Sequence, residues 1–210
     1  MAEAGRVVAG TAGGIRLLAP GPGTRPLADR VKEAVFGILD PDLADARFLD
    51  LFAGSGAAGI EALSRAAVLA VFVERDANAA RVIGENLRRV GLADRGTVVR
   101  MDALRFLGRA TAALGADGHG AAAPATGATG RFDIAFVDPP YAETGLRDAA
   151  LALLGAPGPP DGPTILVPGA RVAATHFWRD APPETVGLLA SERVRRFGET
   201  AVTFYRRRGS

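Results

Sequence analysis

Short apolar runs alternate with amphipathic stretches along most of the chain, and this alternation restricts the fold more than any other feature of the sequence. Runs such as AVFV and IAFV are apolar on both faces, as in parallel strands that are buried between two layers of helices. The sequence therefore predicts an α/β fold with a doubly wound, Rossmann-like sheet, whose ligands bind at the carboxyl ends of the strands. Strands are predicted at residues 46–53, 68–74, 96–103, 131–138, 164–168, 186–194 and 200–207, and helices at 56–66, 77–90 and 103–114.

Two segments lie outside this repeating pattern. Residues 1–45 are predicted to form a small extension, with a hairpin from the runs RVVAG and GIRLL and an amphipathic helix at 29–40. Residues 115–130 consist mostly of Gly, Ala, Pro and Thr, which cannot bury enough surface to offset the entropy of ordering. We therefore expect a main domain at 46–210 that carries a flexible surface insertion at 115–130.

The composition argues against several classes of protein. The chain has no cysteine, which excludes a disulfide framework and a thiolate metal site. No apolar run approaches the roughly 20 residues of a membrane span, and the first residues, MAEAGRVVAG, lack the apolar segment of a signal peptide. We expect a cytoplasmic protein that uses neither a membrane nor a metal.

The charges are distributed unevenly along the chain. Residues 1–32 carry five basic and two acidic side chains, and residues 193–208 carry six arginines and one glutamate. Because the net charge of the whole chain is only +2, the part between them is acidic. This pattern favours an anionic polymer that meets the two ends while the middle performs another task, although a solvated charged surface is the alternative.

The glycines of LDLFAGSGAAGIEAL (residues 49–63) form a GxGxxG pattern at a predicted turn from strand to helix. A dinucleotide would place its pyrophosphate on this turn, but the carboxylate of Asp50 at the same strand end would repel it. S-adenosylmethionine, which carries a sulfonium and an amino group, suits an acidic residue beside a glycine turn better. The alternative for Asp50 is a carboxylate that caps the helix or stabilises the turn.

Two further acids follow the next two predicted strands. Glu74 ends the strand in VFVERD, where a carboxylate can accept hydrogen bonds from both hydroxyls of a ribose. Asp102 follows the strand in VVRMDAL, at a position from which it can accept from an adenine amino group. Each could instead be a helix N-cap, and Asp102 before ALRFL is a fair candidate for that role. Together with the glycines, the acids favour a site for S-adenosylmethionine.

The sequence DPPY (Asp138 to Tyr141) ends another apolar strand, FDIAFV. The two prolines make the backbone rigid, so a side-chain oxygen and a proline carbonyl are held at the edge of the sheet. Those oxygens can accept both hydrogens of a planar exocyclic amine and orient its lone pair toward a methyl donor. Tyr141 offers an aromatic face for a base that has left its stack. The alternative is a rigid turn with Tyr141 packed at its rim.

On these residues the sequence resembles the class I S-adenosylmethionine-dependent methyltransferases of the (D/N)PP(Y/F) group. It is most similar to the bacterial 16S ribosomal RNA guanine-N2 methyltransferases of the RsmD type, in the segments GTRPLADRVKEAVFGIL, LDLFAGSGAAGIEALSRAA, FVERDANAARVIGENL, FVDPPY and RRFGETAVTFYRR. The resemblance implies a class I methyltransferase sheet, with S-adenosylmethionine as the cofactor. The implied catalytic residues are Asp138, Pro139, Pro140 and Tyr141. The implied donor site comprises Asp50, Phe52, Gly54, Gly56, Glu74, Arg75, Asp102 and Ala103. The implied RNA contacts, all in an RNA-facing extension, are Thr24, Arg25, Arg30 and Lys32, with Asp29 nearby.

The resemblance also implies a partner, 16S ribosomal RNA, within the small ribosomal subunit or a late assembly particle. Two other activities remain open. An adenine-N6 methyltransferase that acts on DNA or RNA would use DPPY in the same way, and these four residues do not separate the two amines. An NAD-dependent oxidoreductase leaves DPPY unexplained. The intact set of acids argues against a non-catalytic RNA-binding assembly factor.

Overall fold

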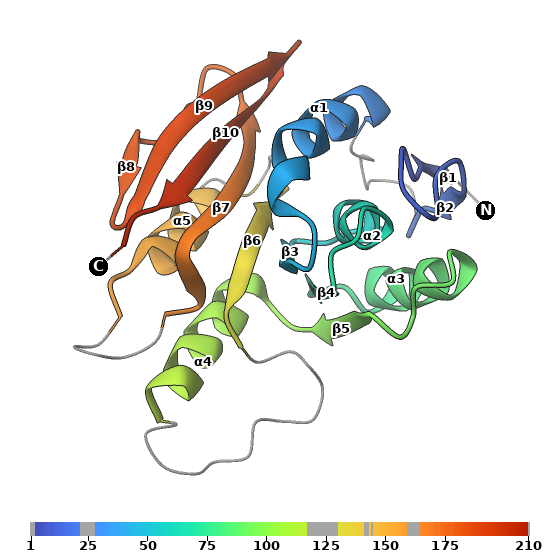
Figure 1. The fold of residues 1–210 in the computed structure, drawn as a ribbon, viewed down its shortest axis with the longest axis horizontal. Coiled ribbons are helices and arrows are strands. Elements are labelled where there is room, and N and C mark those ends of the chain that lie inside the picture. Colours follow the sequence, from blue (N-terminus) through green and yellow to red (C-terminus); the bar gives the residue numbers. More distant parts are fainter. Residues whose placement is uncertain are drawn as a thin grey trace.

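A mixed sheet of eight strands, in the order β5-β4-β3-β6-β7-β10-β9-β8, runs through the molecule (Figure 1). The computed structural model describes residues 3–21, 28–116, 130–140, 143, 145–158 and 164–209. The strands of this sheet are β3 (Arg47–Leu51), β4 (Leu69–Glu74), β5 (Gly96–Arg100), β6 (Phe132–Val137), β7 (Leu166–Phe177), β8 (Thr185–Val186), β9 (Leu189–Phe197) and β10 (Thr200–Arg207). The helices are α1 (Asp29–Leu39), η1 (Asp40–Asp42, a single 3₁₀ turn), α2 (Ala57–Ser64), α3 (Ala77–Arg89), α4 (Ala103–Ala116) and α5 (Leu146–Gly155).

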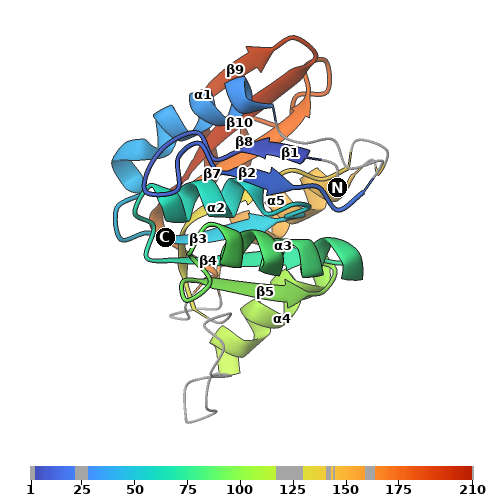
Figure 2. The same ribbon diagram turned by 90° about the vertical axis from the view of Figure 1, so that its right-hand side faces the viewer.

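The five strands from β5 to β7 are parallel, and helices cover both of their faces. Figures 1 and 2 show α1, α2 and α3 on one face of the sheet and α4 and α5 on the other. Successive side chains of a strand enter different cores: Phe48 of β3 packs with the first group of helices, and Leu49 packs with the second. The predicted doubly wound α/β fold is thus confirmed.

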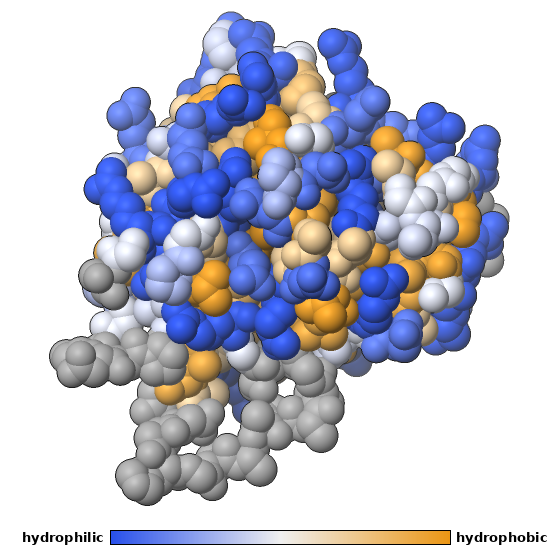
Figure 3. All heavy atoms as spheres, viewed as in Figure 1, coloured by the Kyte–Doolittle hydropathy of each residue, from blue (hydrophilic) through white to orange (hydrophobic). Residues whose placement is uncertain are grey.

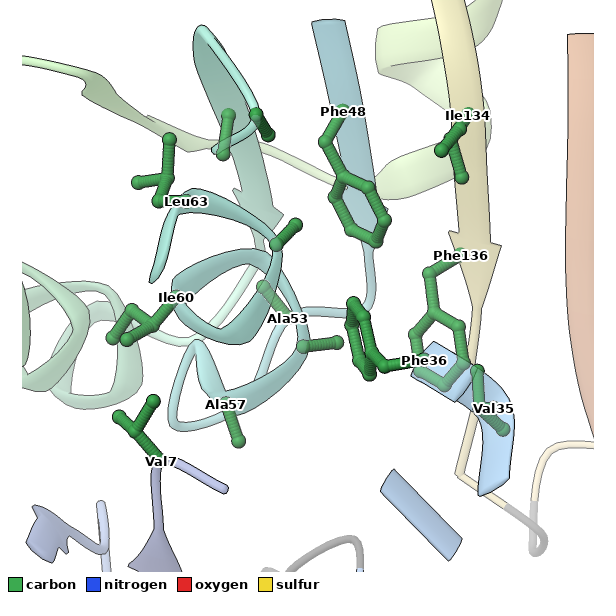
Figure 4. Packing of buried hydrophobic residues seen from close by; sticks show 14 of the residues in the cluster. Val7, Val35, Phe36, Phe48, Ala53, Ala57, Ile60, Leu63, Ile134 and Phe136 are labelled. Carbon is green, nitrogen blue, oxygen red and sulfur yellow. The ribbon is translucent and has the colours of Figure 1, made fainter. Parts of the chain in front are cut away.

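The core beneath α1 is aromatic. Phe36 of α1 lies against Phe48 of β3, with ring centroids 6.0 Å apart, and Phe136 of β6 lies next to them (Figure 4). All three side chains are fully or almost fully buried. The helix that precedes the sheet is therefore packed into the same core as the strands, and the division of the chain at residue 45 stays a prediction.

The predicted hairpin is present, as the antiparallel pair β1 (Glu3–Arg6) and β2 (Arg16–Leu18), but its first strand lies earlier than expected. Residues 6–10 were expected to form that strand. Instead, the backbone N–H groups of Val8 and Ala9 donate to the carboxylate of Glu61 on α2, at 2.6 and 3.0 Å. Glu61 is completely buried, so these bonds fix the hairpin against the main domain.

The strands β7, β10, β9 and β8 form an antiparallel half of the sheet. The sequence predicted β10 correctly, but it predicted β7 only as 164–168, whereas this strand continues to Phe177. Helix α5 was not predicted. Of the expected insertion at 115–130, residues 115 and 116 belong to α4, and residues 117–129 lie outside the described residues. Within the described ranges, no helix has both the length and the hydropathy that a membrane crossing requires.

Candidate active site

A pocket of about 750 Å³ opens at the carboxyl ends of the parallel strands, where a doubly wound sheet binds its ligands. It is bounded by the loops that follow β3, β4, β5 and β6 and by residues from α1 and β10. All but one of the described residues that were predicted to bind the donor or the target amine line this pocket. They are Asp50, Phe52, Gly54, Glu74, Arg75, Asp102, Ala103, Asp138, Pro139 and Pro140.

The exception is Gly56, which is not part of the pocket lining. Its φ of +79° starts α2 in a left-handed conformation, and a Cβ atom there would lie 3.1 Å from Ile83. The third glycine of the pattern, Gly59, packs against the ring of Phe72, which a Cβ would approach to 2.3 Å. These two glycines therefore allow α2 to pack closely, and Gly54 is the one that borders the pocket.

Asp50 has both of the roles considered for it. Its Oδ2 accepts a hydrogen bond from the N–H of Gly59 at 2.9 Å, which caps the first turn of α2, and the same side chain borders the pocket. Burial raises the pKa of Asp50 well above its usual range, and the carboxylates of Asp138 and Glu74 raise it further. A cation bound in the pocket would favour the ionised carboxylate, as expected of a site for a sulfonium and an ammonium group.

Glu74 holds two loops together. Its Oε2 accepts from the N–H of Gly54 at 2.8 Å, and its Oε1 accepts from the N–H of Asp76 at 2.8 Å. Each carboxylate oxygen can accept a second hydrogen bond, so the side chain can also receive the hydroxyls of a ribose. Glu74 thus remains a candidate acceptor for the ribose of S-adenosylmethionine, beside its bonds to the two loops.

Asp102 and Arg75 have structural partners of their own. The Oδ1 of Asp102 accepts from the N–H of Arg105 at 3.0 Å, so the N-cap role considered for Asp102 is present while the residue also borders the pocket. The guanidinium of Arg75 forms a two-pronged ion pair with Glu143, which follows the DPPY segment. This pair links the loop after β4 to the segment after β6.

Asp138 lies beside a residue that the sequence did not reveal. In the parallel pairing of β6 with β7, Val137 is opposite Ala174, and the hydroxyl of the next residue, Thr175, donates to Oδ1 of Asp138. Thr175 is 2% exposed. Burial raises the pKa of Asp138, and the hydrogen bond from Thr175 offsets part of this rise. Thr175 therefore fixes the carboxylate that was predicted to hold the target amine.

The prolines that follow Asp138 continue the edge of the pocket. Pro139 is buried, Pro140 is exposed, and Tyr141 lies outside the described residues. The opposite rim includes Phe197 and Thr200, which are cross-strand neighbours at the adjoining ends of β9 and β10. These two residues belong to the segment RRFGETAVTF, in which the sequence indicated a family likeness but no position in the site.

The predicted RNA contacts are only partly described. Thr24 and Arg25 lie outside the described residues, and Arg30 is exposed on α1. The prediction for Lys32 is wrong, because its side chain is 0% exposed. Its Nζ donates to the carbonyl of Arg6 and lies 3.1 Å from Oδ1 of Asp29, so this charge joins α1 to the hairpin and does not reach the surface.

No group of three or more His, Asp or Glu side chains in the part of the chain that the structure describes could hold a metal ion. The sheet order, the pocket and its acids define a class I S-adenosylmethionine-dependent methyltransferase.

Comparisons with known proteins agree with this class. The chain belongs to the family described as Conserved hypothetical protein 95, which matches residues 5–206. YlbH of Bacillus subtilis, whose name assigns it provisionally as an rRNA methyltransferase, is 38% identical over 205 residues, which are 97% of this chain and 100% of YlbH. Ribosomal RNA small subunit methyltransferase D of Escherichia coli K12 is 36% identical over 150 residues, which are 71% of this chain and 66% of that protein.

A solved structure extends the likeness to three dimensions. The Escherichia coli protein yhhF, named provisionally as a methyltransferase, is 29% identical, with a TM-score of 0.77 over 98% of both chains. The family resemblance indicated by LDLFAGSG and FVDPPY is thereby confirmed.

Proposed function

We propose that this protein transfers a methyl group from S-adenosylmethionine to the exocyclic N2 amine of a guanine in 16S ribosomal RNA. The observation that carries the proposal is the position of Asp138 in the same pocket as the donor-site acids Asp50 and Glu74. A group held by Asp138 would therefore lie within the cavity that holds the donor. When bound, S-adenosylmethionine supplies a methyl group on a positively charged sulfur.

The residues of the pocket would activate the amine mainly by positioning it. The carboxylate of Asp138, held by Thr175, and the carbonyl of Pro139 would accept the two amine hydrogens. The nitrogen lone pair would then point toward the methyl group and away from the ring plane. The nitrogen would form the new C–N bond as the methyl carbon left sulfur with the bonding pair remaining on sulfur, and the carboxylate of Asp138, which holds an amine hydrogen, would accept the proton that the amine then loses.

The likeness to a small-subunit rRNA methyltransferase, at 36% identity, favours ribosomal RNA over DNA as the substrate. The geometry of Asp138 suits either amine, and guanine N2 is preferred over adenine N6 because the sequence resembles the guanine-N2 methyltransferases of the RsmD type. We further propose that the protein acts in the cytoplasm, on the RNA within the small subunit or a late assembly particle.

The test is a transfer assay with labelled S-adenosylmethionine and three substrates: small subunits from a strain that lacks the protein, protein-free 16S RNA and duplex DNA. Label should enter the 16S RNA of the subunits and not the DNA. Transfer to DNA alone would overturn the assignment to ribosomal RNA. A preference for protein-free RNA would overturn the proposal that an assembled particle is the substrate.

A further inference from the structure

Strand β9 is unusually exposed for a strand that lies between two others, β10 and β8, in the sheet. Its residues from Glu192 to Arg196 are all exposed, whereas its neighbour β10 is buried along most of its length. On the other side, β8 pairs only with Leu189 and Ala190. Among the described residues, the rest of β9 therefore has no strand along its outer edge.

The exposed part of β9 carries Arg193, Arg195 and Arg196, and Arg179 follows the end of β7. None of these four arginines forms an ion pair within the described ranges, whereas Arg171 and Arg206 on the neighbouring strands both pair with Glu192. We call Arg193 and Arg195 the β9 arginine surface, because the alternation of side chains places Arg196 on the other face of the strand. Figure 3 shows hydrophilic side chains projecting from the end of the molecule where Figure 1 places β9 and β10.

Charges on an open edge strand can serve only to prevent edge-to-edge aggregation, but that role does not require them to be held in place. Arg196 is held in place, on the other face of the strand. The guanidinium of Arg196 lies 3.7 Å from the centre of the Trp178 ring, and its Nε donates to the carbonyl of Gly198 at 2.8 Å. Arg179 lies over the same ring, at 4.6 Å. Arg196 and the ring that holds it therefore lie on the face of β9 opposite to Phe197 and are not part of the β9 arginine surface.

The strand register directs this surface toward the active site. Arg193, Arg195 and Phe197 pair with Phe204, Val202 and Thr200 of β10. Because side chains alternate along a strand, these three residues of β9 share one face. Each is two residues from the next, which corresponds to about 6.8 Å along the strand. Phe197 and Thr200 border the pocket. The two arginines thus form a row that ends at the pocket rim.

From this arrangement we propose that the β9 arginine surface binds the phosphates of the substrate RNA strand next to the target nucleotide. The inference rests on the proposed function for the identity of the polymer. Guanidinium groups bind phosphate oxygens through paired hydrogen bonds, and arginines without carboxylate partners are free to do so. Phe197, at the end of the row, would meet the base or sugar adjacent to the nucleotide in the pocket.

The test compares charge variants in binding to protein-free 16S RNA and to small subunits, both from a strain that lacks the protein. In Arg193→Gln/Arg195→Gln, affinity for the RNA should fall about ten- to a hundredfold, as expected when two charged hydrogen-bonded contacts are lost. The dependence of log affinity on log salt should flatten by about 1.4, because each single-strand phosphate contact contributes roughly 0.7. Arg89→Gln/Arg109→Gln, which removes two exposed arginines from α3 and α4, should change neither quantity.

A second variant separates RNA binding from edge protection. Arg193→Glu/Arg195→Glu keeps charges on the edge, so the protein should stay monodisperse, yet its affinity for RNA should fall further than in the Gln variant. Donor affinity and melting temperature should match the parent protein in both variants. RNA affinity and salt dependence equal to those of the parent would overturn the proposal. Weaker binding to subunits with unchanged binding to free RNA would also overturn it, in favour of a ribosomal protein as the partner.

These outcomes are distinct from failure of the proposed function. The parent protein could transfer no methyl group to 16S RNA and still bind it through Arg193 and Arg195. That result would support RNA binding by the β9 arginine surface and contradict the guanine assignment. If transfer occurred normally in the Glu variant, the surface would fall and the assignment would stand.

Discussion

The parallel half of the sheet carries acids that line the pocket, whereas the antiparallel half carries arginines on a strand whose end borders the pocket. In the parallel half, Asp50, Glu74 and Asp138 come at or near the carboxyl ends of β3, β4 and β6. In the antiparallel half, the exposed charges of β9 include Arg193 and Arg195. On the proposed function, one sheet would hold a cationic donor and an anionic polymer side by side, because each half presents its own charge.

Besides the backbone pairing of β6 with β7, a side-chain hydrogen bond links the two halves at the edge of the pocket. Thr175 of β7, the last parallel and first antiparallel strand, donates to Asp138 after β6. The following predictions test whether the parallel half binds the donor and holds the amine while the antiparallel half positions Asp138. They run from the largest expected effect to the smallest.

Asp138→Ala should lower the rate of methyl transfer by about 10²–10³-fold, because it removes the group that orients the amine. Donor affinity should be retained. Single-turnover transfer to small subunits measures the rate, and titration calorimetry with S-adenosylmethionine measures the affinity. Asp138→Asn keeps one acceptor oxygen and should retain more activity than the Ala variant. An equal loss of donor affinity and rate would show that Asp138 belongs to the donor site.

Glu74→Ala should weaken S-adenosylmethionine binding by about ten- to a hundredfold, since hydrogen bonds to a charged acceptor contribute roughly 1.5–3 kcal/mol. Part of this loss would come from the N–H of Gly54, which would lose its acceptor. Calorimetry of this variant should be compared with Asp94→Ala, which removes an exposed carboxylate away from the pocket. Unchanged affinity would remove Glu74 from the donor site.

Thr175→Val should reduce transfer about fivefold without changing donor affinity, because the lost hydrogen bond is a single neutral donor to a carboxylate. That bond lowers the pKa of Asp138, against the rise caused by burial. Without it the pKa of Asp138 should rise. On acidification, the rate of transfer should therefore begin to fall at a higher pH than in the parent protein. The pH–rate profile tests this, and Thr175→Ser should restore the parent profile. An unshifted profile would mean that Thr175 only fills space.

Asp50→Asn should produce the smallest change, in stability. Burial raises the pKa of Asp50, so the folded protein holds this proton more tightly than the unfolded chain does. The free energy of unfolding therefore decreases as pH rises from the usual aspartate range, near 3.9, through the raised pKa. Asparagine keeps an acceptor for the N–H of Gly59 and removes the buried charge.

The donor-free Asn variant should consequently melt higher than the parent at pH 7, by on the order of 2–4 °C for each kcal/mol gained. This gain should vanish below about pH 3, where Asp50 is protonated in both states. Thermal unfolding across that range is the measurement, with Asp94→Asn as the control. A gain that persisted in full below about pH 3 would show that packing and not charge is responsible.

The parallel half could be predicted in detail because its information is local. An apolar run that is followed by Asp50 or Asp138 shows both the buried strand and the polar group at its end. The predictions failed where a role depends on distant contacts. Thr175 lies in the run VAATHF, and only the pairing of β6 with β7 brings it to Asp138. Lys32 resembled a surface charge because its partner is the backbone carbonyl of Arg6, which no sequence pattern marks.

The antiparallel half shows the same limit for binding surfaces. The arginines near the end of the chain were visible as charge, and the sequence indicated that they meet an anionic polymer. Their arrangement toward the pocket depends on which residues of β10 they face, such as Val202 opposite Arg195. The contact of Arg196 with the ring of Trp178, on the other face of β9, likewise joins residues that are distant in the sequence.

The most direct test of the account is mass spectrometry of nuclease-digested 16S RNA from a strain that lacks this protein. The account predicts that one N2-methylguanine is missing, and that the purified protein with S-adenosylmethionine restores it on small subunits from that strain. An unchanged content of N2-methylguanine, or the loss of an N6-methyladenine in its place, would contradict it.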